Sequence, residues 1–227
     1  MPGCENWFVR TLMDIDLFSN YLLITVFTLF SIMRIEHYRR ARKAGYQTVV
    51  SESRKYSIWL SVFICYEVFT LFAHIRIRSL DWAPRLLSWA ALDLPLALRL
   101  LGAVLALAAL MLFLWIHRTL GNNLSATLKI KENHTLVTNG PYALVRHPMY
   151  TAFYLLHVAV FFLTANWFIG VTWFIGLSLI VLLRVRREEQ MLIDRFGDEY
   201  RSYMGRTGRF LPAARVAKSS TSADRAT

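Results

Sequence analysis

Cysteine is scarce in this sequence, which has only Cys4 and Cys65 among its 227 residues. Cys4 lies near the N-terminus and Cys65 lies inside an apolar run. Two cysteines so placed support neither a disulfide framework nor a thiolate metal cluster, and they indicate no redox role. A glycine-rich dinucleotide loop following a strand is also absent from the sequence. We therefore expect neither a disulfide-stabilised domain nor a metal centre.

Acidic residues are few: the sequence has 15 Asp and Glu but 26 Lys and Arg, which gives a net charge of +11. Such a charge can indicate nucleic-acid binding, but these basic residues cluster beside apolar runs rather than on one polar segment, so we expect no nucleic-acid partner. The loop before residue 56 and the C-terminal tail are rich in Lys and Arg, whereas the N-terminus and the region near Asn166 have almost none. The positive-inside rule then places the N-terminus outside, and residues 134–150 and the C-terminus in the cytoplasm.

Apolar residues, by contrast, make up 56% of the chain. A helix needs about 20 mainly apolar residues to cross a bilayer. Residues 17–35, 56–75 and 96–116 have this length, while residues 149–183 are too many for one crossing and are interrupted by a polar turn at 164–167. The sequence therefore predicts an all-α, polytopic membrane protein of about five spans, the last two forming a hairpin.

The chain divides into three predicted regions. Residues 1–117 would form a three-span N-terminal part, whose apolar segment 86–94 lies at the interface ahead of Pro95. Residues 118–212 would form the functional core, and the small, polar residues 213–227 a disordered tail. Acidic residues and no basic region precede the first apolar run, so we expect it to be a retained span and not a cleaved signal peptide.

Two polar clusters flank the predicted hairpin. The first is the loop HTLVTNGPYALVRHPMY at residues 134–150, which ends with Pro148 in the first turn of a helix. The free amides and the dipole of that helix end attract an anion, beside which Arg146 and His147 would lie. The second cluster follows the hairpin, where Arg184 and Glu188 are four residues apart and share one helix face. A solvated ion pair is the ordinary explanation of that spacing. Both ends of a hairpin emerge on the same membrane face, however, which favours one shared site.

These residues resemble the isoprenylcysteine carboxyl methyltransferase family, which shares motifs with phospholipid N-methyltransferases. The resemblance covers residues 134–212 and rests on HTLVTNGPYALVRHPMY, then REEQML, then FGDEYRSYMGRTGRFLP, in this order and spacing. It implies a membrane-embedded enzyme that uses S-adenosylmethionine as its cofactor without a Rossmann domain.

The resemblance also implies roles for individual residues. Arg184 matches an arginine that meets the substrate, and Lys131 is a candidate for a further cofactor contact upstream. The implied cofactor contacts are His134, Thr135, Leu136, Val137, Tyr142, His147, Pro148, Met149, Tyr150 and Glu188.

Methyl transfer from a sulfonium needs in-line positioning of the acceptor and exclusion of water, but no metal. An arginine facing the acceptor favours an anion over an ammonium, so Arg184, and in the same way Arg146, indicates carboxyl O-methylation of an isoprenylcysteine-like or other lipophilic acceptor. Phospholipid N-methylation and thiol S-methylation stay open. An NADPH-dependent sterol reductase-like enzyme, which has a similar RHPxY motif, and a non-enzymatic membrane protein are further alternatives.

One more residue stands out, because His157 falls inside the predicted fourth span, where a polar side chain is costly. We expect a hydrogen bond to a neighbouring helix there, or a place in the wall of an acceptor channel.

Overall fold

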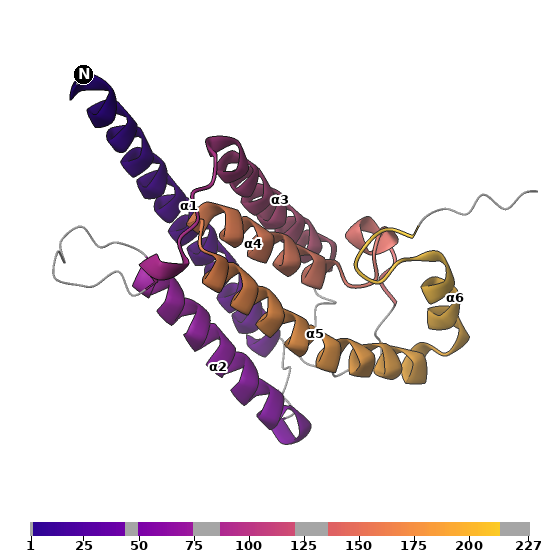
Figure 1. Cartoon of the computed structure of the whole chain (residues 1–227). Coiled ribbons are helices and arrows are strands. Elements are labelled where there is room, and N and C mark those ends of the chain that lie inside the picture. Colours follow the sequence, from indigo (N-terminus) through magenta and orange to yellow (C-terminus); the bar gives the residue numbers. More distant parts are fainter. Residues whose placement is uncertain (1, 44–49, 75–86, 121–135, 214–227) are drawn as a thin grey trace, which may run out of the picture.

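The computed structural model describes residues 2–43, 50–74, 87–120 and 136–213, and within them the regular elements are helical. The all-α prediction is thus confirmed. Figure 1 shows long helices side by side, with a short helix beyond the end of α5. In chain order the elements are α1 (Pro2–Lys43), α2 (Val50–His74), η1 (Ser88–Ala90), α3 (Leu96–Leu120), η3 (Gly140–Ala143), α4 (Pro148–Thr164), α5 (Trp167–Phe196) and α6 (Asp198–Arg206).

The five long helices cover the five predicted spans, apart from residue 75 at the end of the second, which lies outside the described residues. Three have the length and apolarity to cross a membrane: Ile15–Met33 within α1, α3, and α5. The apolar parts of the other two are shorter, Leu60–His74 in α2 and Pro148–Thr164 in α4. The chain is therefore a polytopic membrane protein, while the number of five spans stays a prediction.

The predicted hairpin is formed by α4 and α5. Helix α4 ends at Thr164, and Ala165 reverses the chain with a left-handed φ of 45°. Asn166 then caps α5, since its side-chain oxygen accepts a hydrogen bond from the amide of Ile169 at 3.1 Å. The prediction of a turn at residues 164–167 is confirmed.

Segment 87–92 packs on this hairpin tip. The Asn166 side chain donates to the carbonyl of Leu87 (2.8 Å), and the amide of Leu92 donates to the carbonyl of Ala165 (2.7 Å). The rings of Trp89 and Trp167 meet edge to face with centroids 5.3 Å apart. The turn at Ala165 and Asn166 thus holds segment 87–92, which precedes α3, against the tip of the hairpin.

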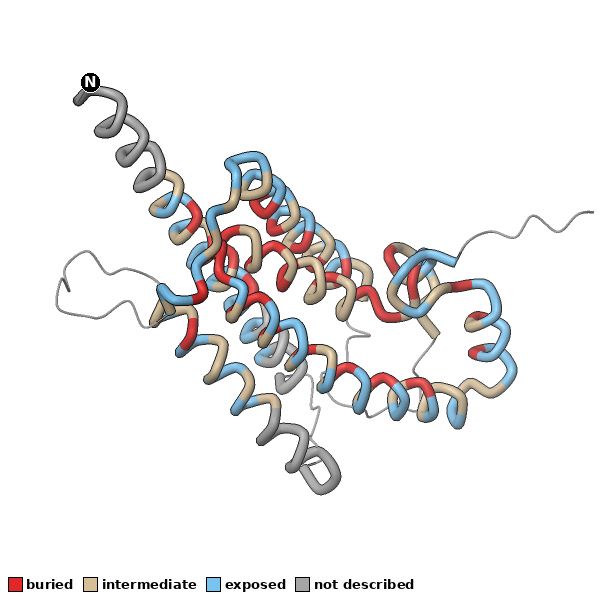
Figure 2. Tube along the Cα trace, viewed as in Figure 1, coloured by how far each residue is buried: buried red, intermediate tan, exposed pale blue. Residues whose placement is uncertain are grey.

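Small residues bring α3 and α4 together in the most extensive helix contact of the bundle. Helix α3 buries Gly102, Ala103, Ala106 and Ala109. Buried residues follow the inner faces of these helices, as Figure 2 shows. Small side chains let helix backbones approach closely, which is the usual basis of packing within a bilayer.

Gly102 gives a first prediction. A Cβ at this position would lie 2.8 Å from Phe162 Cβ and 3.2 Å from the carbonyl oxygen of Ala159, neither of which can rotate away. We expect Gly102→Ala to destabilise the protein by about 1–3 kcal/mol through overpacking, seen as a lower thermal midpoint in detergent. Gly205→Ala is the matched control, because a Cβ there meets nothing within 4 Å. Equal midpoints for the two variants would contradict this account of the α3–α4 contact.

Polar side chains attach α2 to the hairpin. His157 Nε2 lies 2.9 Å from a carboxylate oxygen of Glu67, and both side chains are largely buried. Nearby, the indole of Trp173 donates to the Thr70 hydroxyl at 2.9 Å. The hydrogen bond expected from His157 to a neighbouring helix is therefore present. Such contacts matter in a bilayer because lipid tails are as apolar as the helix faces, so there is no hydrophobic driving force for the helices to associate.

The Glu67–His157 pair gives a second prediction. Replacing one partner leaves the other buried without its counter-group, so we expect His157→Leu to cost roughly 3–5 kcal/mol. The double variant Glu67→Leu/His157→Leu should recover much of that loss, since an apolar pair of similar size needs no desolvation of charge. Thermal unfolding of the two single variants and the double variant measures the coupling. Strictly additive losses would show that the pair contributes nothing.

Candidate active site

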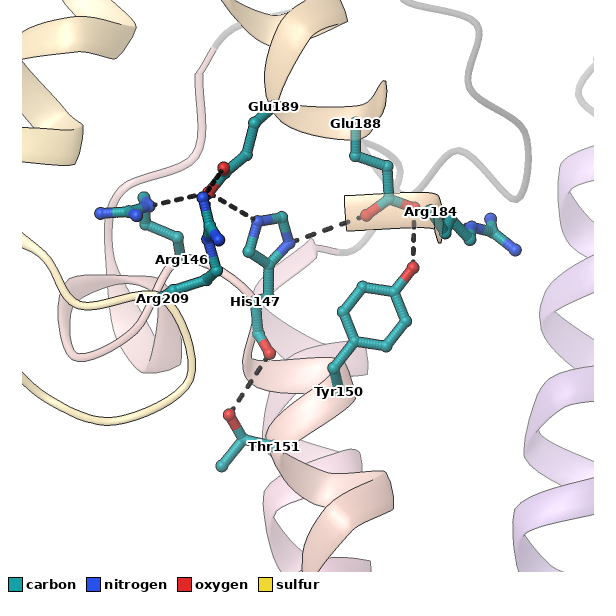
Figure 3. A network of polar contacts seen from close by, with 8 residues as sticks. All are labelled: Arg146, His147, Tyr150, Thr151, Arg184, Glu188, Glu189 and Arg209. Atoms are coloured by element: carbon teal, nitrogen blue, oxygen red, sulfur yellow. Dashed lines mark hydrogen bonds and ion pairs between the residues drawn. The ribbon is translucent and has the colours of Figure 1, made fainter. Parts of the chain in front are cut away.

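The end of α5 carries polar residues past the apolar part of the bundle. Helix α5 has 30 residues, which span about 45 Å, more than the roughly 30 Å of a hydrocarbon core. Its apolar sequence ends at Leu183, and the segment 184–189 that follows is charged except at Val185. Because α4 and α5 form a hairpin, the start of α4 lies at this same end. The two polar clusters of the sequence therefore meet there (Figure 3).

The two polar clusters meet around His147. It is the N-cap of α4 and precedes Pro148, whose missing N–H suits the first helical turn. The buried imidazole lies between two carboxylates, with Nδ1 3.7 Å from Glu188 Oε2 and Nε2 3.3 Å from Glu189 Oε1. The two carboxylates fix the orientation of the ring. The Thr151 hydroxyl lies 3.3 Å from the His147 carbonyl oxygen.

Glu188 holds the predicted Tyr150 and Arg184 together. Its Oε1 accepts hydrogen bonds from the Tyr150 hydroxyl and from Arg184 Nε, each at 2.9 Å. The Glu188 side chain is 20% exposed and that of Arg184 32% exposed, so both remain accessible at the rim of the network. A partly exposed carboxylate can accept hydrogen bonds from the polar groups of a ligand, and the guanidinium next to it can bind an anion.

Glu189 is the centre of a more deeply buried cluster, and the sequence did not single it out as a site residue. Its carboxylate accepts hydrogen bonds from Arg146 Nε (3.2 Å) and Arg209 Nε (3.1 Å), in addition to its contact with His147. Burial raises the pKa of Glu189, but the hydrogen bonds from His147 and Arg209 outweigh it and hold the pKa at about 2. The stabilisation by this carboxylate is thus present above its ordinary pKa and is lost only as the pH falls towards 2.

Arg146 faces the C-terminal segment. Its Nη1 donates to the carbonyl of Met204 at 2.9 Å and also to that of Thr207. Together with Glu189, these acceptors engage the guanidinium within the fold. The predicted contact of Arg146 with an acceptor stays untested, and the observed contacts give it a positioning role.

Tyr142 lies in η3 beneath α6. Its carbonyl accepts a hydrogen bond from the Tyr203 hydroxyl at 2.6 Å. Burial, and then the charges of Tyr203 and Glu188, raise the pKa of Tyr142. Burial likewise raises the pKa of Tyr203, to about 12, so its hydroxyl stays protonated at neutral pH and donates to the Tyr142 carbonyl.

The other predicted cofactor residues lie around this network or outside the described part. Leu136 and Val137 are half-buried and irregular, and their backbone groups make no hydrogen bond to another described residue. Pro148 is buried and Met149 packs against the main core. His134 and Thr135, like Lys131, lie outside the described residues.

These features define a class of protein: a helical membrane bundle with a His–Glu–Arg network where one hairpin leaves the apolar region. Within it, residues 100–194 match the model of the isoprenylcysteine carboxyl methyltransferase (ICMT) family. The family resemblance inferred from the sequence is confirmed over this segment, which contains His147, Arg184 and Glu188.

Known proteins that are similar to the chain include the following two. One is the protein-S-isoprenylcysteine O-methyltransferase of Schizosaccharomyces pombe (strain 972 / ATCC 24843), 35% identical over 75 residues, or 33% of this chain and 32% of that protein. The match thus spans about a third of the length of this curated relative. The other is the solved structure of a eukaryotic intramembrane Ras methyltransferase, ICMT, with a TM-score of 0.43, 23% identity and coverage of 84% of this chain and 67% of that one.

Proposed function

We propose that this chain is an S-adenosylmethionine-dependent methyltransferase of the membrane, which methylates the carboxylate of an isoprenylcysteine-like or other lipophilic acceptor. The observation that carries the proposal is the position of Glu188, held between Tyr150 and Arg184 beside His147 at the end of the apolar bundle. The segment containing these residues matches the isoprenylcysteine carboxyl methyltransferase family.

The residues present fit this cofactor. The irregular backbone at Leu136 and Val137 carries amide and carbonyl groups, which are the kind of donor and acceptor that recognises an adenine edge. The Glu188 carboxylate suits the hydroxyl and ammonium groups of the same molecule. When bound, S-adenosylmethionine would supply a methyl group that its sulfonium makes electrophilic.

The remaining task of the protein is to hold the acceptor and exclude water. Arg184 carries a positive charge at the rim of the network. The carboxylate of an acceptor is already ionised near neutral pH, so this acceptor needs no general base before it attacks the methyl group. Arg184 would hold that carboxylate while Glu188 keeps the guanidinium oriented from the other side. The same charge disfavours a protonated amine, which would also have to lose a proton first.

We place this site on the cytoplasmic face and the N-terminus outside. The support is the distribution of Lys and Arg along the sequence, which are frequent among the residues of the site and in the C-terminal tail but absent from residues 147–183, which form most of the hairpin.

Purified protein in detergent tests the proposal in two steps. Calorimetry with S-adenosylmethionine should give saturable binding, and absence of binding would refute the cofactor assignment. Membranes incubated with the methyl-labelled cofactor should then yield a base-labile methyl ester on a lipophilic product. A base-stable labelled lipid amine would instead indicate phospholipid N-methylation, and a labelled thioether would indicate thiol S-methylation.

A further inference from the structure

The segment Thr207–Phe210, here named the C-terminal strap, lies beyond the residues that match the family model. After α6 it returns to the start of α4 and pairs with the backbone there. The amide of Arg146 donates to the carbonyl of Gly208 at 2.8 Å, and the amide of His147 donates to the carbonyl of Arg209 at 3.0 Å. The strap is therefore attached directly to the residues that open the candidate site.

Side-chain contacts also hold the C-terminal end of the strap, at Arg209 and Phe210. Arg209 donates through Nε to the buried carboxylate of Glu189 at 3.1 Å and makes a second contact through Nη2. Next to it, the carbonyl of Phe210 accepts a hydrogen bond from the Thr151 hydroxyl at 2.8 Å. A two-point contact between a guanidinium and a carboxylate is directional, so it sets the position of the following residue.

The Phe210 ring lies where the polar network meets the apolar bundle. Its centroid is 6.0 Å from that of His147, 6.4 Å from that of Tyr150 and 5.9 Å from that of Tyr154. The ring also packs against an apolar cluster on α5 formed by Leu177, Val181 and Val185. Phe210 thus borders His147 and Tyr150, which contact Glu188, while its other neighbours belong to the membrane part.

We propose that Phe210 is a specificity-determining residue, whose ring forms the wall on which the apolar chain of the acceptor packs while the acceptor's head lies at Arg184 and Glu188. Arg209 is the positioning residue that sets the wall by binding Glu189. This inference rests on the proposed function for the identity of the acceptor. An amphiphilic acceptor must cross the boundary between polar and apolar surroundings, and Phe210 occupies that boundary.

Direct binding of an N-acetyl-S-prenylcysteine to the purified full chain in detergent tests the role of Phe210. Phe210→Ala should weaken this binding by about tenfold, as expected for loss of an aromatic contact, and should leave S-adenosylmethionine affinity within about twofold. Leu211→Ala is the matched control, because Leu211 is 76% exposed. Wild-type affinity in Phe210→Ala, or no binding of the probe to the wild-type chain, would overturn the proposal.

Arg209→Gln tests the positioning role by a readout that needs no turnover. Without the guanidinium, the backbone amides of Arg146 and His147 should exchange hydrogen faster, because their acceptors are in the strap, and Arg209→Lys should restore part of the protection. Unchanged exchange in Arg209→Gln would contradict the role. Wild-type chain that binds the probe but transfers no methyl group would refute the proposed function and leave the role of the strap in place.

Discussion

Replacing Glu188 with glutamine should lower methyl transfer by at least about 100-fold and weaken S-adenosylmethionine binding to a similar degree. The carboxylate accepts hydrogen bonds from Tyr150 and from Arg184 and faces the imidazole of His147. A hydrogen bond to a charged group contributes about 1.5–3 kcal/mol, so loss of the contacts proposed between the Glu188 carboxylate and the hydroxyl and ammonium groups of the cofactor is sufficient for this effect. The amide of glutamine would also point a donor at Arg184 or Tyr150.

Two control variants separate loss of function from loss of fold. Glu199→Gln makes the same change of charge at an exposed position on α6 and should behave as wild type. Glu189→Gln removes the buried partner of Arg146 and Arg209, so it should lower the thermal midpoint, whereas Glu188→Gln should keep it nearly unchanged. Wild-type cofactor affinity in Glu188→Gln would show that Glu188 is not part of the cofactor site.

The hairpin could be predicted because its signals are local. An apolar run too long for one crossing requires a turn, and the polar residues at 164–167 mark where the turn occurs. Pro148 fixes the start of α4 in the same way, since its ring suits only the first helical turn. The contact between Arg184 and Glu188 follows from a spacing of four residues on one helix.

The centre of the network could not be predicted, because it depends on a chain reversal. Arg209 reaches Glu189 only after the chain turns at Gly197, which has a positive φ of 54°, and passes through α6. Nothing in the sequence separates Glu189 from Glu188 as the buried acid of the pair, since a shift of one residue on α5 decides which side chain points inward. The adjacent acids are the only signal of this second role.

The pairing of His157 with Glu67 could not be predicted from the sequence either, because it also depends on how distant parts of the chain pack. These residues are 90 positions apart and come from helices that are not consecutive. Their polarity inside apolar runs indicates that each needs a partner, but it does not identify the partner. The division of the chain into regions 1–117, 118–212 and 213–227 stays a prediction.

Arg184→Ala should raise the KM for a carboxylate acceptor by about 10- to 100-fold, the loss expected when one charge-assisted contact of about 1.5–3 kcal/mol is removed. The effect should fall mainly on acceptor binding, because Tyr150 still donates to Glu188 and keeps its carboxylate in place. Arg184→Lys keeps the charge but not the planar geometry of the guanidinium, so its KM should lie between that of the wild type and that of Arg184→Ala.

The size of this effect also identifies the acceptor. Arg186→Ala removes the same charge from an exposed neighbour on α5 and should leave KM unchanged, which excludes a general effect of membrane-surface charge. An amine acceptor would be repelled by Arg184, so its KM would fall or stay constant in Arg184→Ala, and a neutral thiol would respond little. Steady-state kinetics with the three acceptor classes therefore decide whether Arg184 selects a carboxylate. An unchanged KM for the carboxylate would remove the physical reason for preferring O-methylation.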